Sequence, residues 1–355
     1  MSPRRLASSG IDTNDEDAYD RPRRTRPRTK NRPDYSTLPM GTVLGIDRGR
    51  YRVMLDDQVH GHQQKHHPHR RDHQGAAIPA SGQEVVAAKA RRLGRRSVIV
   101  GDRVRLDGDT SGAEGTLARI AETEKRRNVL RRTADDTDPY ERPIVANTDQ
   151  IFIVTALADP PPRTGMIDRI LVAAYEAGTE PVLCLTKADL APADELAAMY
   201  RPLGVPVVTS SPGSDLAPLR DLLTDRVTVL VGHSGVGKST LINALVPGVS
   251  RRTGEVNEVT GRGRHTSTSA LALPLPEGGW IIDTPGVRSF GLSHVTADDV
   301  LAAFPDLDPF TADCPRGCPH TAGSPECGLD EALAAGRISE ARLDSFRRLD
   351  AARTQ

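Results

Sequence analysis

The sequence predicts a multidomain α/β protein. A small N-terminal β-barrel precedes a nucleotide-binding domain, whose mixed sheet carries helices on both faces, and a mostly helical metal-binding module follows. Three observations predict this order: short strand-like runs between residues 41 and 120, a glycine-rich phosphate-binding motif at 232–239, and three closely spaced cysteines after residue 313. The length of 355 residues suits two or three domains, and 37% hydrophobic with 3% aromatic residues allows modest cores.

Residues 1–37 predict a disordered basic tail. An acidic patch is followed by an arginine- and proline-rich run at 21–32, a composition that does not build a packed core. The basic run suits a polyanionic partner, and a solubilising tail is the alternative. Net charge is zero over the whole chain, but residues 1–132 hold 28 Lys and Arg against 17 Asp and Glu. The front third is therefore basic.

Residues 38–134 predict a small barrel such as an OB-fold, which is a frequent nucleic-acid binder. The expected strands are 41–46, 51–55, 84–88, 97–100, 103–106 and 115–120. The expected RNA contacts are the basic residues Arg50, Arg52, Arg91, Arg92, Arg95 and Arg96. Because aromatic residues are scarce, phosphate contact should outweigh base stacking. A merely solvated basic face is the alternative.

A histidine-rich insertion at 58–76 interrupts the barrel. It holds six of the ten histidines. No apolar framework surrounds them to fix metal geometry, so we expect a surface loop.

The motif at 232–239, Gly-His-Ser-Gly-Val-Gly-Lys-Ser, follows the apolar run 227–231 and precedes a helix-like segment. Its backbone N–H groups would cradle the phosphates, Lys238 would reach the β and γ oxygens, and Ser239 would hold Mg²⁺. Strand, loop and helix stand where this function requires them. An ordinary glycine-rich turn is the alternative.

Two further motifs indicate guanine nucleotides. Asp283, in Asp-Thr-Pro-Gly, ends the strand-like run 280–283 and would lie near the metal. The segment 186–189, Thr-Lys-Ala-Asp, ends another strand-like run, and the Asp189 carboxylate can accept two protons from guanine but not from adenine. The strand-like run at 207–211 would carry a second guanine loop. The base-reading loops precede the phosphate loop, so residues 135–293 predict a circularly permuted GTPase domain.

The C-terminal module, residues 294–355, predicts a structural zinc site. Cys314, Cys318, His320 and Cys327 offer three thiolates and an imidazole at close spacing. Buried thiols or a redox pair are the alternatives.

Together these motifs resemble the RsgA (YjeQ) family of GTPases, which act in small ribosomal subunit biogenesis. The resemblance also draws on Ala-Asn-Thr-Asp-Gln at 146–150 and Arg-Gly-Arg-His-Thr-Ser-Thr at 262–268, and it spans about residues 40–349. It implies late maturation of the 30S subunit, contact with 16S rRNA, and GTP hydrolysis to GDP that the subunit stimulates. The chain departs from the family in having Thr186 for the usual Asn, which puts nucleotide affinity in question, and in a finger spacing one residue tighter before Cys318.

The resemblance and the motifs assign the site residues. GTP would contact Thr186, Lys187, Ala188, Asp189, Ser210, Gly232, His233, Ser234, Gly235, Val236, Gly237, Lys238, Ser239, Thr240, Asp283 and Gly286. Ser239 and Thr266 would hold magnesium, and Cys314, Cys318, His320 and Cys327 one zinc ion.

The residue after Asp-Thr-Pro-Gly is Val287, whereas Ras-like enzymes place a water-orienting glutamine there. We therefore expect slow intrinsic turnover and hypothesise that Lys238 and His265 are the catalytic residues. A loop histidine that contacts RNA or solvent is the alternative for His265.

Two other functions remain open: an RNA-binding module with GTP as an affinity switch only, and a P-loop ATPase or kinase, against which Asp189 argues. No signal peptide and no long apolar run are found, and the thiols suit metal binding, so we expect a cytoplasmic protein without membrane contact. Nothing indicates a coiled coil, and we expect a monomer.

Overall fold

The computed structural model describes residues 34–56, 82–94, 98–132, 142–246, 270–284, 292 and 295–353. The tail as far as residue 33 and the histidine-rich insertion 58–76 lie outside this part. The predicted domain boundaries at 134/135 and 293/294 also lie outside it.

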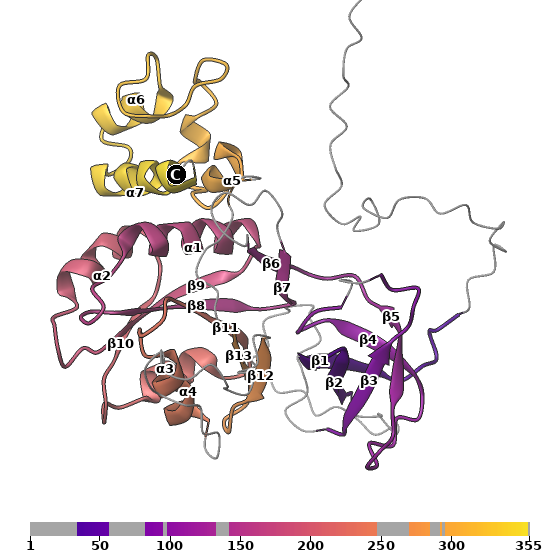
Figure 1. Ribbon diagram of the computed structural model, residues 1–355. Coiled ribbons are helices and arrows are strands. Elements are labelled where there is room, and N and C mark those ends of the chain that lie inside the picture. Colours follow the sequence, from indigo (N-terminus) through magenta and orange to yellow (C-terminus); the bar gives the residue numbers. More distant parts are fainter. Residues whose placement is uncertain are drawn as a thin grey trace, which may run out of the picture.

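The N-terminal domain is a closed five-stranded barrel (Figure 1). Its strands are β1 (Met40–Asp47), β2 (Arg50–Leu55), β3 (Glu84–Lys89), β4 (Arg103–Gly108) and β5 (Ala118–Thr123). They pair in the order β1-β2-β3-β5-β4, and β4 pairs back onto β1. Only the β3–β5 pair among these is parallel. Alternate side chains such as Val43, Val53 and Ile120 fill the interior. This is the OB-fold that the strand pattern predicted.

One predicted strand is wrong. Residues 98–100, the described part of the predicted strand 97–100, are buried but form no barrel strand. The N–H of Ile99 donates to the Asp102 carboxylate (2.8 Å), and Val100 makes an isolated parallel bridge to Val145. This apolar run is buried, and its backbone bonds to Asp102 and to residues 145–146 instead of a barrel strand.

A hairpin that was not predicted links the two domains. It consists of β6 (Val129–Arg132) and β7 (Arg142–Ala146), which pair antiparallel.

The nucleotide-binding domain has a mixed sheet in the order β10-β9-β8-β11-β13-β12. The strands are β8 (Gln150–Ala156), β9 (Glu180–Thr186), β10 (Val207–Ser210), β11 (Val227–Val231), β12 (Leu271–Pro274) and β13 (Trp280–Asp283). All pairs are parallel except β12–β13. The carboxyl ends of β8 to β11 and β13 therefore meet at one edge.

Helices cover both faces of this sheet (Figure 1). On one face lie α1 (Thr164–Glu176), α2 (Asp194–Tyr200) and a short 3-10 helix (Arg201–Leu203); on the other lie α3 (Ala217–Leu223) and α4 (Lys238–Leu245). Successive strand residues alternate between two cores, one with α1 and α2, the other with α3 and α4. Both faces are apolar, which explains why the strands read as continuous hydrophobic runs.

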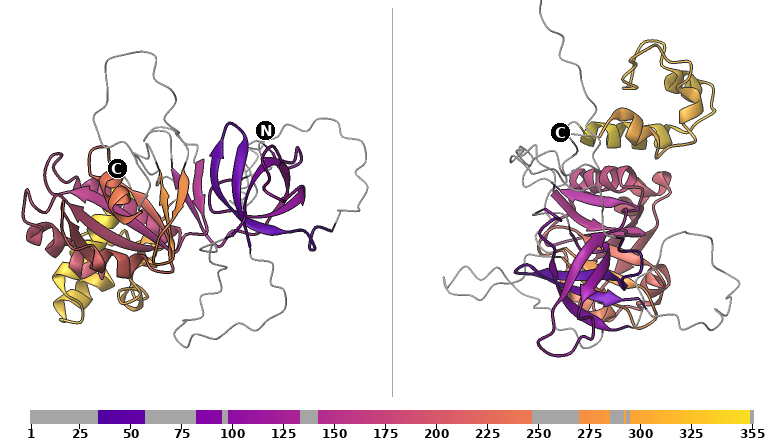
Figure 2. Two further views of the ribbon diagram at one scale, coloured as in Figure 1. Left: turned by 90° about the horizontal axis from the view of Figure 1, so that it is seen from below. Right: turned by 90° about the vertical axis from the view of Figure 1, so that its right-hand side faces the viewer.

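The barrel continues this sheet. Gly45 of β1 pairs with Leu271 of β12, so eleven strands form one hydrogen-bonded sheet (Figure 2). A Cβ on Gly45 would lie 2.9 Å from Leu271 Cδ1, so a larger residue would require the leucine side chain to move.

The C-terminal module contains α5 (Ala297–Leu301), a 3-10 helix (Asp308–Phe310), α6 (Gly328–Ala334) and α7 (Glu340–Arg353). Helix α7 lies along α1 (Figure 1). Arg348 of α7 pairs with Asp168 of α1 (3.1 Å) and lies over the Tyr200 ring. Burial raises the pKa of Asp168, and the Arg348 charge opposes the rise. A charge pair with a buried carboxylate therefore fastens the module to the nucleotide-binding domain.

Candidate functional site

The phosphate-binding motif forms the expected strand, loop and helix. β11 ends at Val231, and α4 begins at Lys238. Gly235 and Gly237 have φ values of +81° and +92°, which favour glycine. At Gly232 a Cβ would overlap the Val154 carbonyl. The glycines thus permit both the turn and its close contact with β8.

Lys238 folds back over this loop. Its Nζ donates to the carbonyl oxygens of Gly232 and, at 2.9 Å, of His233. Burial lowers the pKa of Lys238, while the Asp283 carboxylate opposes the change. A phosphate group would be a stronger partner than two carbonyls, so this ammonium is poised to exchange them for an anion.

Thr186 ties the guanine motif to the phosphate loop. Its hydroxyl lies 2.5 Å from the Val236 carbonyl and 3.2 Å from that of Thr155, and the residue is 5% exposed. Thr186 stands where the family usually has asparagine, and this difference put nucleotide affinity in question. The threonine keeps the tie, but its hydroxyl has only one proton to donate, and a backbone carbonyl of the protein already accepts it.

The other guanine-motif residues lie beside it. Lys187 has φ +56°, and its Nζ donates to the Asp159 carbonyl. The N–H of Ala188 donates to the Ser210 carbonyl (3.2 Å), which joins the two predicted guanine loops. Asp189 is exposed. Asp159 was not predicted; the run of prolines that follows it was the available signal for a specific turn.

Asp283 lies at the end of β13 and is 6% exposed. It is in register with Leu230 of β11, one residue short of that strand's end. Thr284 donates its hydroxyl proton to the Leu230 carbonyl (2.8 Å). The carboxylate is thereby held beside the phosphate loop. Gly286, Val287, His265 and Thr266 lie outside the described residues.

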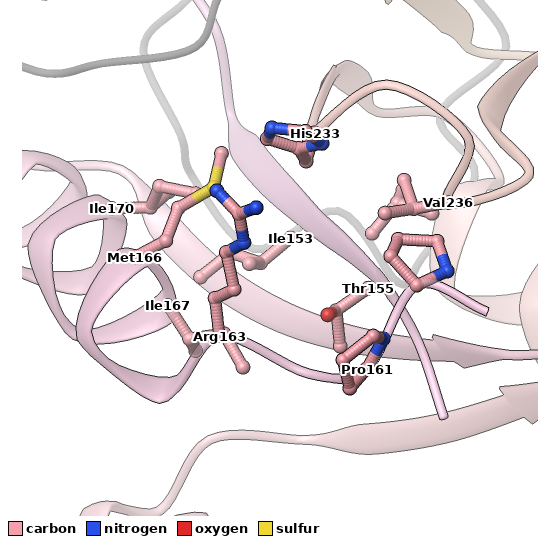
Figure 3. Close-up of a pocket in the computed structure, with 12 residues that line it drawn as sticks. Ile153, Thr155, Pro161, Arg163, Met166, Ile167, Ile170, His233 and Val236 are labelled. Carbon is pink, nitrogen blue, oxygen red and sulfur yellow. The ribbon is translucent and has the colours of Figure 1, made fainter. Parts of the chain in front are cut away.

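A pocket opens next to the phosphate loop, between it and α1 (Figure 3). His233 and Val236 line the pocket from the loop. Met166 lines it from α1, and Arg163 from the position just before that helix. Gly232, His233 and Val236 of the predicted phosphate cradle line this pocket, whereas Lys238, Ser239 and Asp189 do not, so the pocket adjoins the cradle on the side of α1.

The cysteine and histidine side chains in the C-terminal module converge. The ligand atoms of Cys314, Cys318, His320 and Cys327 all lie within 4.8 Å of one another. Gly328 donates its N–H to Cys314 Sγ (3.2 Å), and Arg347 of α7 holds the His320 carbonyl (2.8 Å). Three thiolates and one imidazole, with an N–H directed at a sulfur, could hold one tetrahedral metal ion.

Several basic residues of the barrel are already engaged. Arg52 pairs with Glu84 (2.6 Å), and Arg92 lies 4.3 Å from the Tyr35 ring centre. Arg50 and Arg91 are exposed, whereas Arg95 and Arg96 lie outside the described residues. Among the described arginines, Arg52 and Arg92 therefore already have partners within the protein.

Among the described residues, no helix combines the length and apolar character that crossing a bilayer requires.

Comparison with known proteins gives consistent matches. A family described as RsgA GTPase matches residues 123–293. Proteins named small ribosomal subunit biogenesis GTPase RsgA match from Pseudomonas aeruginosa strain LESB58, at 42% identity over 67% of this chain and 72% of the relative. The protein of that name from Pseudomonas fluorescens strain SBW25 is 40% identical over 71% of this chain and 74% of the relative.

Two solved structures are similar. YjeQ from Thermotoga maritima matches with a TM-score of 0.62 and 25% identity over 88% of this chain and 97% of that chain. YloQ, described as a circularly permuted GTPase, matches in fold with a TM-score of 0.59, at 22% identity over 90% of this chain and 96% of that chain.

Proposed function

The chain belongs to the RsgA GTPase family, and from this premise we propose that it assists late maturation of the small ribosomal subunit through GTP hydrolysis that the subunit stimulates. It is a GTPase with a permuted order of motifs. The observation that carries the proposal is the meeting of the phosphate loop, the guanine loops and Asp283 at one sheet edge. The curated relatives, which are named for small-subunit biogenesis, support the partner.

The residue roles are part of the proposal. Backbone N–H groups of 232–239 and the Lys238 ammonium bind the phosphates, and Asp189 reads guanine. Ser239 and Thr266 would hold Mg²⁺, and the bound ion would neutralise charge that develops on the phosphate oxygens. His265 orients the attacking water when the subunit is bound.

We assign the metal cluster to one structural zinc ion. All four ligands come from the protein, which leaves no open position for substrate. Arg347 links the cluster to α7, and Arg348, the next residue, links α7 to Asp168 of α1. The metal would therefore hold the module in the form that docks on the nucleotide-binding domain.

The barrel would bind 16S rRNA through exposed arginines such as Arg50 and Arg91. GTP would favour the bound form, and hydrolysis after docking would release the protein. We propose that the protein acts as a monomer in the cytoplasm. A hydrolysis-deficient variant that still binds GTP should stay trapped on the subunit; normal release of such a variant would contradict the cycle.

The first experiment measures phosphate release from GTP, and from ATP as a control, with and without purified 30S subunits. We expect the subunits to stimulate phosphate release strongly from GTP and not from ATP. Equal rates with and without subunits would overturn the proposed partner while leaving the GTPase assignment intact.

A further inference from the structure

The Asn-Thr-Asp-Gln segment at residues 147–150 lies between the barrel and the nucleotide-binding domain. The function proposed above gives it no role. We define the joint as these four residues together with Arg126 and Arg127. Its contacts reach both domains.

Asn147 connects Arg127 of the joint with the barrel. It has φ +58°, a conformation that asparagine tolerates better than most residues. Its Oδ1 accepts the N–H of Arg127 (2.7 Å), and its Nδ2 donates to the Gly101 carbonyl of the barrel (2.8 Å). A Cβ on Gly101 would overlap the Ala146 carbonyl, so the two backbones touch. One side chain and one close approach thus fix the barrel at this point.

Two adjacent arginines pair in opposite directions. Arg126 makes two bonds to the buried Asp102 of the barrel (2.7 and 2.9 Å). Arg127 pairs with Asp149 of the nucleotide-binding domain (2.6 Å). Charge-assisted bonds of this kind resist rearrangement more than neutral ones. The link is therefore a stiff connection and not a flexible tether.

Asp149 carries the connection into β11. Its Oδ2 accepts the N–H of Val227 (2.7 Å), and its own N–H donates to the Val227 carbonyl (2.8 Å). The Gln150 amide, 2% exposed, donates to the Leu222 carbonyl and the Thr228 hydroxyl, both at 2.7 Å. Val227 begins the strand that ends directly before the phosphate loop. The joint thus sets the position of the strand that presents this loop.

We propose that the joint couples the barrel to the phosphate loop, with Asn147, Arg127 and Asp149 as positioning residues for partner-stimulated hydrolysis. The proposal rests on the proposed function. When the barrel binds structured RNA, a shift of the barrel is transmitted through the contacts of Gly101 with Asn147 and of Asp149 with Val227. Strand β11 then carries the shift to the phosphate loop. Without the hydrogen bonds and ion pairs of the joint, the two domains would be free to move independently, as linked domains usually do.

The test uses the full chain and two variants. Asn147→Gly keeps the positive φ accessible and deletes both side-chain bonds, and Arg127→Gln breaks the pair with Asp149. Arg226→Gln is the matched control, since it breaks the exposed pair with Glu180 (2.5 Å) at the same edge without touching the barrel. The readouts are GTP turnover with and without 30S subunits and hydrogen exchange of the Val227 amide.

We expect both joint variants to keep their intrinsic turnover and to lose about 5- to 150-fold of the stimulated rate, the usual range for coupling between sites. Exchange at Val227 should be faster in both, and the control should behave as the parent. Full stimulation in both joint variants would overturn the proposal. An equal loss of intrinsic and stimulated turnover would also overturn it, because the joint would then act on the site itself.

If the parent chain shows no stimulation, the proposed function fails and exchange alone decides on the joint. A structured RNA that binds the barrel must then slow exchange at Val227 in the parent and not in Asn147→Gly. Equal exchange in the two proteins would reject the coupling.

Discussion

Replacing Thr186 with valine removes the hydroxyl that ties the guanine motif to the phosphate loop and preserves the shape of the side chain. The Val236 carbonyl, 2.5 Å from that hydroxyl, then loses this hydrogen bond. Both residues are buried, with Thr186 only 5% exposed. Leaving such a buried acceptor unsatisfied costs about 1–3 kcal/mol. Since 1.4 kcal/mol corresponds to tenfold in an equilibrium constant, we expect GDP affinity to fall by about tenfold. This fall in affinity is expected because the phosphate loop loses the tie that holds it in place and must be ordered when GDP binds. The rest of the cost lowers the free energy of unfolding.

Titration with a fluorescent GDP analogue and thermal unfolding measure these two effects. Thr186→Ser is the matched control, since it keeps the hydroxyl and should bind GDP as the parent does. Thr186→Asn should bind more tightly, because a carboxamide can keep the tie and also reach the base. Valine and serine variants with equal affinity and equal unfolding temperature would refute the argument.

Three other predictions concern separate parts of the molecule. Asp189→Asn should weaken GTP binding by about 10- to 150-fold, the equivalent of a charged hydrogen bond of 1.5–3 kcal/mol, and should favour xanthosine triphosphate in a competition assay; unchanged preference for GTP would contradict the role of Asp189. Cys318→Ser should reduce the zinc content from one ion per chain towards none, measured by elemental analysis, and should expose α7 to proteolysis, whereas full zinc content would exclude Cys318 as a ligand. The raised pKa of Asp168 means that the native state keeps its proton where the unfolded state, with a pKa near 3.8, has lost it. This carboxyl therefore lowers the free energy of unfolding as pH rises from about 3.8 through its native pKa, and Asp168→Asn should reduce that slope in urea unfolding at a series of pH values; an identical slope would show that another group is responsible.

The sequence predicted the parts of the fold that depend on local chemistry. The phosphate loop needs a strand, glycines and a helix start in succession, and β11, Gly235 and α4 supply them. The convergence of Cys314, Cys318, His320 and Cys327 also followed from close spacing. In both cases, residues near in sequence determine the geometry.

The parts that the sequence did not predict depend on distant partners. The apolar residues 98–100 resemble a strand, but they bond to Asp102 and Val145 instead of a barrel strand. Similarly, composition counts Arg52 as a free cation, whereas β2–β3 pairing places Glu84 beside it. The hydroxyl of Thr186 is another such case, because its acceptor lies fifty residues further along the chain.

The position of β11 in the sheet has a consequence for synthesis. This strand lies between β8, which precedes it, and β13, which ends at Asp283. The barrel strands, in contrast, are all complete by Thr123. Because domains generally fold from the N-terminus as the chain emerges, we expect the barrel to be finished while the phosphate loop still lacks its second neighbouring strand. A newly made chain would therefore meet polyanions before it can hold a nucleotide.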